Sequence, residues 1–362
     1  MTGYIEMAVT AVVVNYKTER LVGQLIRHLY AFPEIRSIIV VDNSGAIDLA
    51  EKRAGPKNIE LIRNSANLGF AKGVNQGLKH VETDWVLVIN PDVRLDNACL
   101  RHLLDAANTY DAVLTGPRFY WDDDYLFRLP PSTGDFMGMY GALNAASHFE
   151  IDAKLADFYW QIRHERFWAA TEPFFEPFLS GACLLVQMPW ILAKGGVLFD
   201  ERFFLYYEDT DLCAQALLND ESPICVPAAK AIHYYNQSPA PPQTKMAAIN
   251  KSGEQFYEKY YSHYRVQTIH GPPSRPLQIE DLGKQKTPPR FGFGKDCDCG
   301  YAYFEIALNS LFVPFIQCDL ASDDFCLPET VWQRLAPGTY YSRVRNPQKN
   351  QNRIWKWEKV NA

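Results

Sequence analysis

Short, mainly apolar runs alternate with amphipathic segments over the first 90 residues of the chain. Four such runs, rich in Val and Ile, predict strands at residues 9–14, 38–41, 59–62 and 85–89. Between the first two, residues 18–30 place their leucines and Ile26 on one face at helical spacing. Strands that are apolar on both faces and alternate with helices are typical of a parallel sheet. The pattern therefore predicts an α/β domain whose mostly parallel central sheet is flanked by helices.

The pattern becomes irregular in the middle of the chain. Residues 120–178 are rich in aromatic side chains, and they predict an insertion that covers one side of a ligand site. Strand patterns return at residues 182–186 and 229–232, and residues 244–264 predict an amphipathic helix. We therefore expect a first domain over residues 1–268 that contains the insertion.

Beyond this domain the composition changes. Five prolines predict a proline-rich linker over residues 269–290. Short β-prone segments separated by turn residues follow, at residues 301–308, 311–316, 339–344 and 354–357. This spacing predicts a small all-β sandwich over residues 291–362. Within it, residues 335–345 (LAPGTYYSRVR) resemble the penultimate-strand motif of fibronectin type III-like domains, and Trp355 and Trp357 would then lie in the last strand.

Composition excludes some classes of protein. The 362 residues carry a formal net charge of -6, which argues against a general nucleic-acid role. Most of the eight cysteines sit singly in apolar segments, as reduced core thiols do, and the pair Cys297 and Cys299 lacks partners for a tetrahedral metal site. No stretch reaches the roughly 18 apolar residues of a membrane span. We therefore expect a cytoplasmic protein, in contact with the cell membrane at most peripherally, on its inner face.

An acidic segment gives the strongest indication of chemistry. Residues 203–207 are five large, mostly aromatic side chains, and three carboxylates follow within four positions, at Glu208, Asp209 and Asp211. Carboxylates this close repel one another, and burying an unpaired one is costly. A site that needs a general base or holds a cation can offset that cost. The alternative is the acidic first turn of a helix, where carboxylates complement the helix dipole.

Two further motifs follow predicted strands. Asp42 closes the second strand, where a carboxylate can accept the imide N–H of a uracil or thymine ring; the alternative is a turn cap. Residues 64–77 (NSANLGFAKGVNQG) contain three glycines at a spacing of four. Such glycines permit a ligand to approach a helix N-terminus closely, and Lys72 would suit a phosphate there. The same spacing also suits close helix packing, and the segment lacks the ending of a P-loop.

Asp92 and His233 also follow predicted strands. Asp92 stands in an Asn-Pro-Asp sequence, where one carboxylate can ligate Mg²⁺ or Mn²⁺; a proline turn capped by the Asp is the alternative. His233 can ligate the same metal or contact a diphosphate, or it can be structural. In an open α/β sheet, ligands bind beyond the carboxyl ends of the strands. These polar groups therefore predict a ligand site at that edge of the sheet.

Six motifs in this order resemble those of family-2 glycosyltransferases, and look closest to the rhamnosyltransferase-like branch. They are VVNY, VVDNS, NLGFAKGVNQG, NPDV, SGACLLV and FFLYYEDTDL, and they extend from about Val9 to Ser238. The resemblance implies a GT-A fold, a nucleotide-diphosphosugar donor, Mn²⁺ or Mg²⁺ as cofactor and inversion at the anomeric carbon. The branch suggests L-rhamnose from dTDP-rhamnose, with UDP- and GDP-sugars as alternatives.

The resemblance also implies a role for each matching position. Asp209 matches the catalytic base and Glu208 its acidic neighbour, so both are predicted to be catalytic. Asp92 matches the last Asp of a DXD motif and His233 a late metal-site or diphosphate-site His, so both are predicted metal ligands. Asn90 replaces the first Asp of that motif and removes one charge. The predicted donor-binding residues are Asn15, Asp42 (the nucleobase-binding carboxylate), Asn67, Gly69, Lys72, Asn75 and Asn90.

The expected reaction moves a sugar to a hydroxyl of a glycan or lipid-linked acceptor in cell-surface polysaccharide assembly. One alternative is a nucleotidyltransferase, which should have an N-terminal glycine-rich loop that residues 14–17 (VNYK) lack. The other is a catalytically inactive sugar-binding or scaffold protein, against which intact Asp92 and Asp209 argue. Residues 343–362 contain six Lys or Arg and one acidic residue, which suits peripheral contact with an anionic lipid surface or a polymeric acceptor. A solvated strand edge with core tryptophans is the alternative for this segment.

Overall fold

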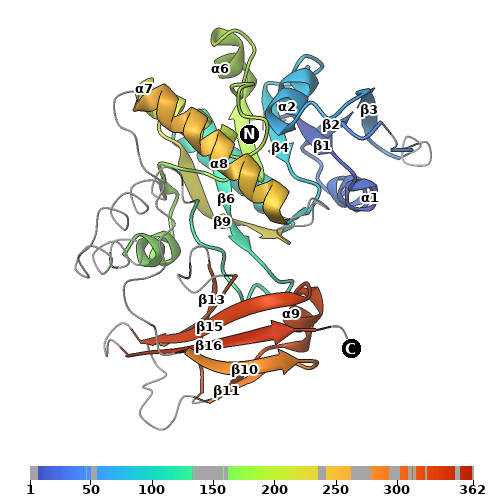
Figure 1. The fold of residues 1–362 in the computed structure, drawn as a ribbon. Coiled ribbons are helices and arrows are strands. Elements are labelled where there is room, and N and C mark those ends of the chain that lie inside the picture. The colour runs from blue at the N-terminus through green and yellow to red at the C-terminus, as the bar shows by residue number, and fades with distance from the viewer. Residues whose placement is uncertain are drawn as a thin grey trace. The chain divides into compact units, whose positions relative to one another are not determined.

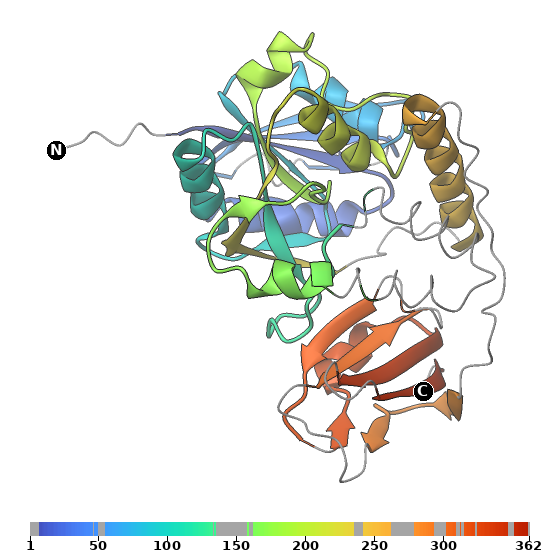
Figure 2. The same ribbon diagram turned by 90° about the vertical axis from the view of Figure 1, so that its left-hand side faces the viewer.

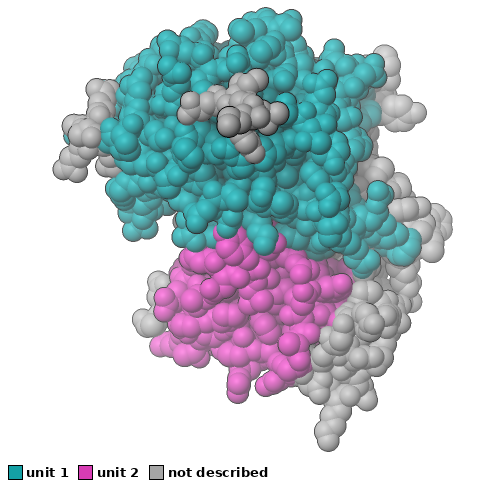
Figure 3. All heavy atoms as spheres, turned by 180° about the vertical axis from the view of Figure 1, so that it is seen from behind, with its two compact units in different colours: residues 1–118, 131–270 teal, residues 119–130, 271–362 magenta. Residues whose placement is uncertain are grey.

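The computed structural model describes residues 7–45, 47–49, 55–132, 134, 158, 162–234, 242–261, 279–292, 302–308, 312, 315–322, 324–346 and 351–360. The chain divides into two compact units (Figure 3). Unit 1 comprises Met1–Arg118 and Pro131–His270, and unit 2 comprises Phe119–Pro130 and Gly271–Ala362.

Unit 1 is built on one large sheet, in which the described residues form nine strands (Figure 1). Along the sheet these are β3 (Asn58–Arg63), β2 (Ile35–Asp42), β1 (Val9–Asn15), β4 (Trp85–Ile89), β8 (Cys183–Gln187), β6 (Leu114–Tyr120), β9 (Ile224–His233) and β5 (Val93–Leu95), with β7 (Phe174–Phe175) paired to β9. Strands β3, β2, β1 and β4 run parallel, as predicted. Strand β8 runs antiparallel to β4, and β5 and β7 run antiparallel to β9, so the whole sheet is mixed. An apolar run predicts burial but not strand direction.

Helices cover both faces of this sheet (Figure 2). They are α1 (Glu19–Leu29), α2 (Phe70–Leu78), α3 (Cys99–Thr109), α6 (Met188–Ala193), α7 (Glu208–Leu218) and α8 (Pro242–Tyr260). Helix α2 packs closely on β1, because a Cβ atom added at Gly73 would lie 3.0 Å from Val14 and one at Gly77 would lie 2.7 Å from Val12. Two of the three spaced glycines therefore serve helix packing, which was the alternative for that motif.

Unit 2 is rich in strands. Its described residues form a five-stranded sheet, in the order β10 (Ile279–Gln285), β16 (Gln351–Lys359), β15 (Gly338–Asn346), β12 (Tyr303–Ala307) and β13 (Phe315–Asp319). Strands β11 (Arg290–Gly292) and β14 (Asp324–Cys326) pair separately, and α9 (Glu329–Arg334) is a short helix. Residues 119–130 belong to this unit because the backbone of Arg128 pairs with Gln317 and its guanidinium lies 2.7 Å from Asp319.

Strand β10 corrects the linker prediction in part. It lies inside residues 269–290 and pairs parallel with β16. All five prolines of that stretch lie outside β10, so each residue of the strand keeps its backbone N–H. The prolines lie on either side of β10, so counting them predicted a linker and gave no indication of the strand between them.

The basic C-terminal segment contains core tryptophans and paired cations. Trp355 and Trp357 are buried in the core of unit 2. Arg353 and Lys356 each pair with an acidic residue of β10, at 3.1 and 3.2 Å. The buried tryptophans match the core-tryptophan part of the alternative, and neither is exposed for contact with a lipid surface. Strand β16 is not an edge strand, however, because it pairs with β10 on one side and β15 on the other. Within the described ranges, no helix combines the length and the apolarity that crossing a bilayer requires.

Candidate active site

Asn15 and Asp42 form a first polar cluster, where β1 and β2 end side by side. Both are fully buried, and Asn15 Nδ2 donates a hydrogen bond to Asp42 Oδ1 at 2.8 Å. The backbone N–H and hydroxyl of Ser44 donate to the same oxygen, and the Ile47 N–H donates to Asp42 Oδ2 at 3.0 Å. Burial raises the pKa of Asp42, but these hydrogen bonds together hold it below its ordinary value. The geometry is that of a turn cap, and nucleobase binding by Asp42 stays a prediction.

Three predicted donor residues lie at the start of α2. Asn67 Oδ1 accepts a hydrogen bond from the Gly69 N–H at 3.0 Å. Gly69 has a φ of 87°, and a Cβ atom there would lie 2.4 Å from the carbonyl oxygen of Phe204. The close approach that this glycine permits is therefore to another segment of backbone. The side chain of Lys72 is half exposed, with Nζ 3.7 Å from Glu201 Oε2.

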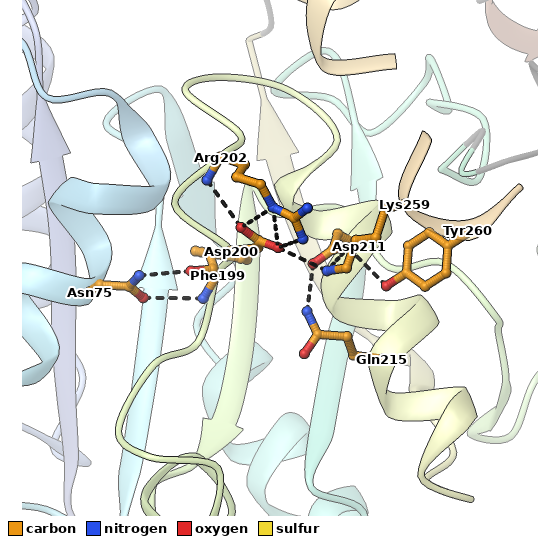
Figure 4. A network of polar contacts seen from close by, with 8 residues as sticks. All are labelled: Asn75, Phe199, Asp200, Arg202, Asp211, Gln215, Lys259 and Tyr260. Atoms are coloured by element: carbon orange, nitrogen blue, oxygen red, sulfur yellow. Dashed lines mark hydrogen bonds and ion pairs between the residues drawn. The ribbon is translucent and has the colours of Figure 1, made fainter. Parts of the chain in front are cut away.

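The contacts of Asn75 differ from its predicted donor-binding role. Its side chain is 3% exposed, and Nδ2 donates to the Phe199 carbonyl at 2.7 Å (Figure 4). Oδ1 accepts from the N–H groups of Leu198 and Phe199, both at 3.1 Å. A buried amide that is bonded on both sides to loop backbone fixes that loop. These bonds favour a structural role for Asn75, and its role in donor binding stays a prediction.

Asp92 and His233 meet in a second cluster, as their predicted shared role requires. Strand β5 begins directly after Asp92 and pairs with β9, which places Val93 opposite His233. His233 Nε2 lies 3.5 Å from Asp92 Oδ2, and both side chains are largely buried. Burial raises the pKa of Asp92, but the charge and hydrogen bond of His233, and the charge of Lys245, hold it below its ordinary value. Lys245 on α8 is a cation near this cluster that the sequence did not single out.

The Asp92–His233 pair suits a divalent cation that arrives with its substrate. Among the described residues, no group of three or more His, Cys, Asp or Glu side chains is arranged to hold a metal ion. Mg²⁺ in phosphate chemistry, however, usually keeps only one or two protein ligands, and substrate phosphates and waters complete its shell. Asp92 offers a hard oxygen ligand and His233 an imidazole. The two residues therefore fit a cation bound together with a diphosphate.

The backbone just before the acidic pair is strained. Tyr206 and Tyr207 are both left-handed, with φ of 70° and 66°. Bulky residues rarely adopt this conformation, which costs about 1–3 kcal/mol each and persists only with support from the surroundings. Helices α2 and α8 give that support: the first N–H of α2 donates to the Phe204 carbonyl, and the Ser252 hydroxyl of α8 donates to the next carbonyl, both at 2.8 Å. Strain of this kind clusters at functional sites.

Glu208 and Asp209 open α7 in different surroundings. Asp209 accepts hydrogen bonds from the backbone N–H groups of Gly181 and Thr210, each at 2.8 Å. Glu208 is buried, and its Oε2 has no hydrogen-bond partner among the described residues. Burial and then the charge of Asp209 raise the pKa of Glu208 to about 8. Burial also raises the pKa of Asp209, against the hydrogen bonds from Gly181 and Thr210. With a pKa of about 8, Glu208 keeps its proton at neutral pH, and the two backbone N–H groups favour the ionised form of Asp209 against its burial.

The dipeptide Gly181-Ala182 is hydrogen-bonded both to the turn that carries Asp92 and to Asp209 of the acidic pair. The Asn90 N–H donates to the Ala182 carbonyl at 2.9 Å, and the Gly181 N–H donates to Asp209. A Cβ atom at Gly181 would lie 3.0 Å from the Cβ atom of Asp209, so a side chain there would crowd the carboxylate. The turn that carries Asp92 and the helix turn that carries Asp209 are therefore both bonded to one short piece of backbone.

Asp211 is the buried centre of a polar network and does more than complement the helix dipole. Its Oδ1 accepts from Lys259 Nζ at 2.6 Å and from the Tyr260 hydroxyl at 2.8 Å, and its Oδ2 accepts from Gln215 at 2.5 Å (Figure 4). Lys259 also donates to Asp200 Oδ2 at 2.9 Å. Sequence reasoning missed Lys259 and Asp200, because the only local signal is a lysine on the predicted helix 244–264.

Comparison with known proteins identifies the class of this fold and site. Residues 10–169 match the model of the family described as Glycosyl transferase family 2. The N-acetylglucosaminyl-diphospho-decaprenol L-rhamnosyltransferase of Mycobacterium tuberculosis is 30% identical over 237 residues, which are 60% of this chain and 72% of that protein. The rhamnosyltransferase WbbL of Escherichia coli is 26% identical over 231 residues, which are 62% of this chain and 82% of that protein.

Among solved structures, the chain is similar to the mannosyltransferase PcManGT from Pyrobaculum calidifontis, in complex with GDP-Man and Mn²⁺. Its TM-score is 0.47 at 12% sequence identity, over 71% of this chain and 65% of that chain. The chain belongs to glycosyl transferase family 2, and it is a glycosyltransferase of the GT-A fold with a separate C-terminal sheet. This membership favours the glycosyltransferase expectation over the nucleotidyltransferase alternative.

Proposed function

We propose that this glycosyltransferase moves L-rhamnose from dTDP-rhamnose to a hydroxyl of a lipid-linked glycan acceptor, with inversion and with help from Mn²⁺ or Mg²⁺. The relatives from M. tuberculosis and E. coli are both named rhamnosyltransferases, and the first acts on a diphospho-decaprenol lipid by its name. A lipid-linked acceptor would bring the enzyme to the inner face of the cell membrane. Work at that face from the cytoplasm is part of the proposal.

The observation that carries the proposal is the junction at Gly181-Ala182. Transfer requires a base beside the acceptor hydroxyl and a compensated charge on the leaving diphosphate, close to one another. Asp209 is bonded to Gly181, and the turn that leads to Asp92 is bonded to Ala182. This arrangement supports a donor diphosphate at Asp92 and an acceptor at Asp209.

Asp209 is the proposed base. Its two oxygens accept backbone N–H groups, which favour the ionised form that a base needs. In the proposed reaction the acceptor oxygen attacks the anomeric carbon as the bond to the leaving diphosphate breaks, and the hydroxyl proton passes to Asp209. Glu208, whose pKa is about 8, is the protonated neighbour in this proposal. The Oε2 atom of Glu208, which has no hydrogen-bond partner in the described part of the chain, suits a hydrogen bond to the acceptor.

Asp92 and His233 are the proposed metal ligands. A divalent cation bound there would offset negative charge on the leaving phosphates. The charge of Lys245 lies near Asp92 and supports the same electrostatic role. Phe204 is 45% exposed while Phe203 is buried, and it is the most exposed residue of the aromatic segment, so it is the proposed acceptor contact.

A matched pair of variants tests the base assignment. Asp209→Asn should lower kcat by about 1000-fold, because proton abstraction by a positioned base contributes roughly 100- to 10,000-fold. Donor binding, measured by calorimetry, should persist. Glu208→Gln keeps a neutral hydrogen-bonding group of similar shape and should cost far less. Equal turnover in Asp209→Asn and the unmodified enzyme would contradict the assignment.

A thermal-shift screen identifies the donor. A ligand that binds only the native state at 100 times its Kd adds about 2.7 kcal/mol of stability. We expect dTDP-rhamnose with Mn²⁺ to raise Tm more than UDP- and GDP-sugars do. Asp92→Ala should remove the part of this shift that depends on Mn²⁺. A larger shift with another nucleotide sugar would replace the donor in this proposal, and an unchanged Mn²⁺ effect in Asp92→Ala would contradict the metal site.

We also propose that unit 2 is a fibronectin type III-like sandwich and forms a domain distinct from the catalytic one. Support comes from Tyr340, whose hydroxyl donates to the Ala336 carbonyl at 2.7 Å. A tyrosine near the start of a strand that bonds to backbone a few residues upstream is the tyrosine corner of such sandwiches. Tyr340→Phe removes that hydrogen bond alone. It should lower the stability of the protein by about 1 kcal/mol, and unchanged unfolding would argue against the motif.

A further inference from the structure

The residues from Asp200 to Asp211 form a segment that contains the strained tyrosines and the acidic pair, and both its ends meet one cation. Lys259 Nζ donates to Asp200 Oδ2 at 2.9 Å and to Asp211 Oδ1 at 2.6 Å (Figure 4). The same ammonium lies 5.9 Å from the centre of the Phe203 ring, within the segment. Lys259 therefore contacts the beginning, the interior and the end of the segment 200–211.

Three features make this contact more than a surface ion pair. Asp211 is fully buried, and the side chains of Asp200 and Lys259 are 19% and 20% exposed. The Tyr260 hydroxyl shares Asp211 Oδ1 with Lys259, so α8 supplies two adjacent donors to one oxygen. At the other end, Arg202 donates to Asp200 from within the segment itself. Fully paired charges at this depth fix geometry, because neither partner can turn to water without losing its neighbour.

The segment needs such a constraint. Tyr206 and Tyr207 hold left-handed backbone directly before Glu208, and such backbone persists only when the surrounding structure holds it in place. The other supports each hold the segment at one place, such as the hydrogen bonds to the carbonyls of Phe204 and Leu205 and the one from the Gly181 N–H to Asp209. Among the described contacts, the ammonium of Lys259 is the one group that bonds to both Asp200 and Asp211.

We propose that Lys259 is a positioning residue of the transfer reaction, which closes the segment 200–211 and thereby aims Asp209 at the acceptor hydroxyl. This inference rests on the proposed role of Asp209 as base. Lys259 itself contacts neither substrate nor the reacting atoms. Its contribution is to hold the start of α7, where a displacement of about 1 Å at the base costs roughly 100-fold in rate.

Lys259→Met tests the proposal, since Met keeps the length of the side chain and removes the ammonium. We expect kcat to fall about 100-fold while the Kd for the donor and its Mn²⁺ dependence stay unchanged. Lys259→Arg, which restores the charge and its donors, should recover most of kcat. Lys251→Met is the matched control, because Lys251 is exposed on the same helix, and it should behave as the unmodified enzyme does.

A merely structural lysine would give a different result. Then Lys259→Met would lower Tm but keep kcat within about threefold when assayed well below that Tm, and the proposal would be overturned. Hydrogen exchange gives a readout without activity: amides of residues 203–212 should exchange faster in Lys259→Met than in Lys251→Met. Equal exchange in the two variants also overturns the proposal.

A second variant covers the case in which Lys259→Met does not fold. Asp200→Asn opens one end of the segment and leaves the buried pair of Lys259 with Asp211 intact. It should lower kcat about tenfold with donor Kd unchanged, and an unchanged kcat overturns the proposal. Failure of the proposed function looks different, because then the unmodified enzyme transfers no sugar or Asp209→Asn keeps full turnover. If transfer depends on Asp209 but not on Lys259 or Asp200, only the positioning role falls.

Discussion

The buried carboxyl of Glu208 allows a direct test of the electrostatics of the site. In the folded protein its pKa is raised to about 8 by burial and by the charge of Asp209, whereas the ordinary value is 4.5. Between these values the folded protein keeps a proton that the unfolded chain has released. Stability therefore falls as the pH rises from about 4.5 towards 8, and the loss is absent below the unfolded pKa.

The size of this effect follows from the two pKa values. Each pH unit between them corresponds to about 1.4 kcal/mol, so Glu208 costs the folded state about 3 kcal/mol at pH 7 relative to pH 4.5. Glu208→Gln removes the titration and keeps the shape of the side chain. We expect the variant to be more stable than the unmodified protein at pH 7 to 8, with a flatter dependence on pH.

Urea unfolding between pH 5 and 8 measures this directly, because the midpoint and slope give the free energy of unfolding at each pH. Glu254→Gln, an exposed carboxyl on α8, is the matched control and should keep the pH dependence of the unmodified protein. If Glu208→Gln and the unmodified protein lose stability in parallel from pH 5 to 8, the reasoning about the buried proton is refuted.

Three further predictions concern stability. Gly69→Ala should cost at least about 2 kcal/mol in urea unfolding, because φ is 87° and the new Cβ atom meets a carbonyl oxygen at 2.4 Å; Gly292→Ala, with nothing within 4 Å, should change little. Asp211→Asn should lower the free energy of unfolding by about 3 kcal/mol, because the largely buried ammonium of Lys259 then lacks its closest carboxylate. The ion pair of Asp281 with Lys356 is exposed, so Asp281→Asn should change stability little. The pKa of Asp42 is lower in the folded protein than in the unfolded chain, so Asp42 stabilises the folded state above the unfolded pKa, and this stabilisation is lost as the pH falls. In Asp42→Asn the urea unfolding midpoint should therefore fall less steeply on acidification.

The sequence predicted the fold where local pattern decides it. Apolar runs that end in polar residues located β1, β2 and β4 and the carboxyl ends where Asn15 and Asp42 lie together. The positions of Asp92 and His233 after predicted strands indicated a shared site, but their direct contact depends on the pairing of β5 with β9, which the sequence did not predict. The antiparallel direction of β8 was not predicted, since strand direction is set by how distant segments connect.

The site residues show where reasoning from sequence runs out. Asn75 stands in a motif whose glycines suggest a ligand, yet its amide bonds to loop backbone, and helical spacing alone does not say which way an amide faces. The sequence left two roles open for Asp211, that of a site residue and that of a carboxylate that complements the helix dipole. Its true partner, Lys259, lies 48 residues further along the chain, and nothing local links the two. Long-range polar pairs of this kind require the tertiary structure.

The contact of Gly69 with Phe204 has a consequence for how the enzyme family can diversify. Here the segment 200–211 is held through its main chain, because the carbonyls of Phe204 and Leu205 accept hydrogen bonds from α2 and α8. Gly69 leaves space for the Phe204 carbonyl. The side chain of Phe204 remains 45% exposed and makes none of those bonds. Substitutions at position 204 should therefore change the exposed surface near the proposed base and leave these two main-chain hydrogen bonds in place, so the proposed acceptor side could vary while the proposed base keeps its position.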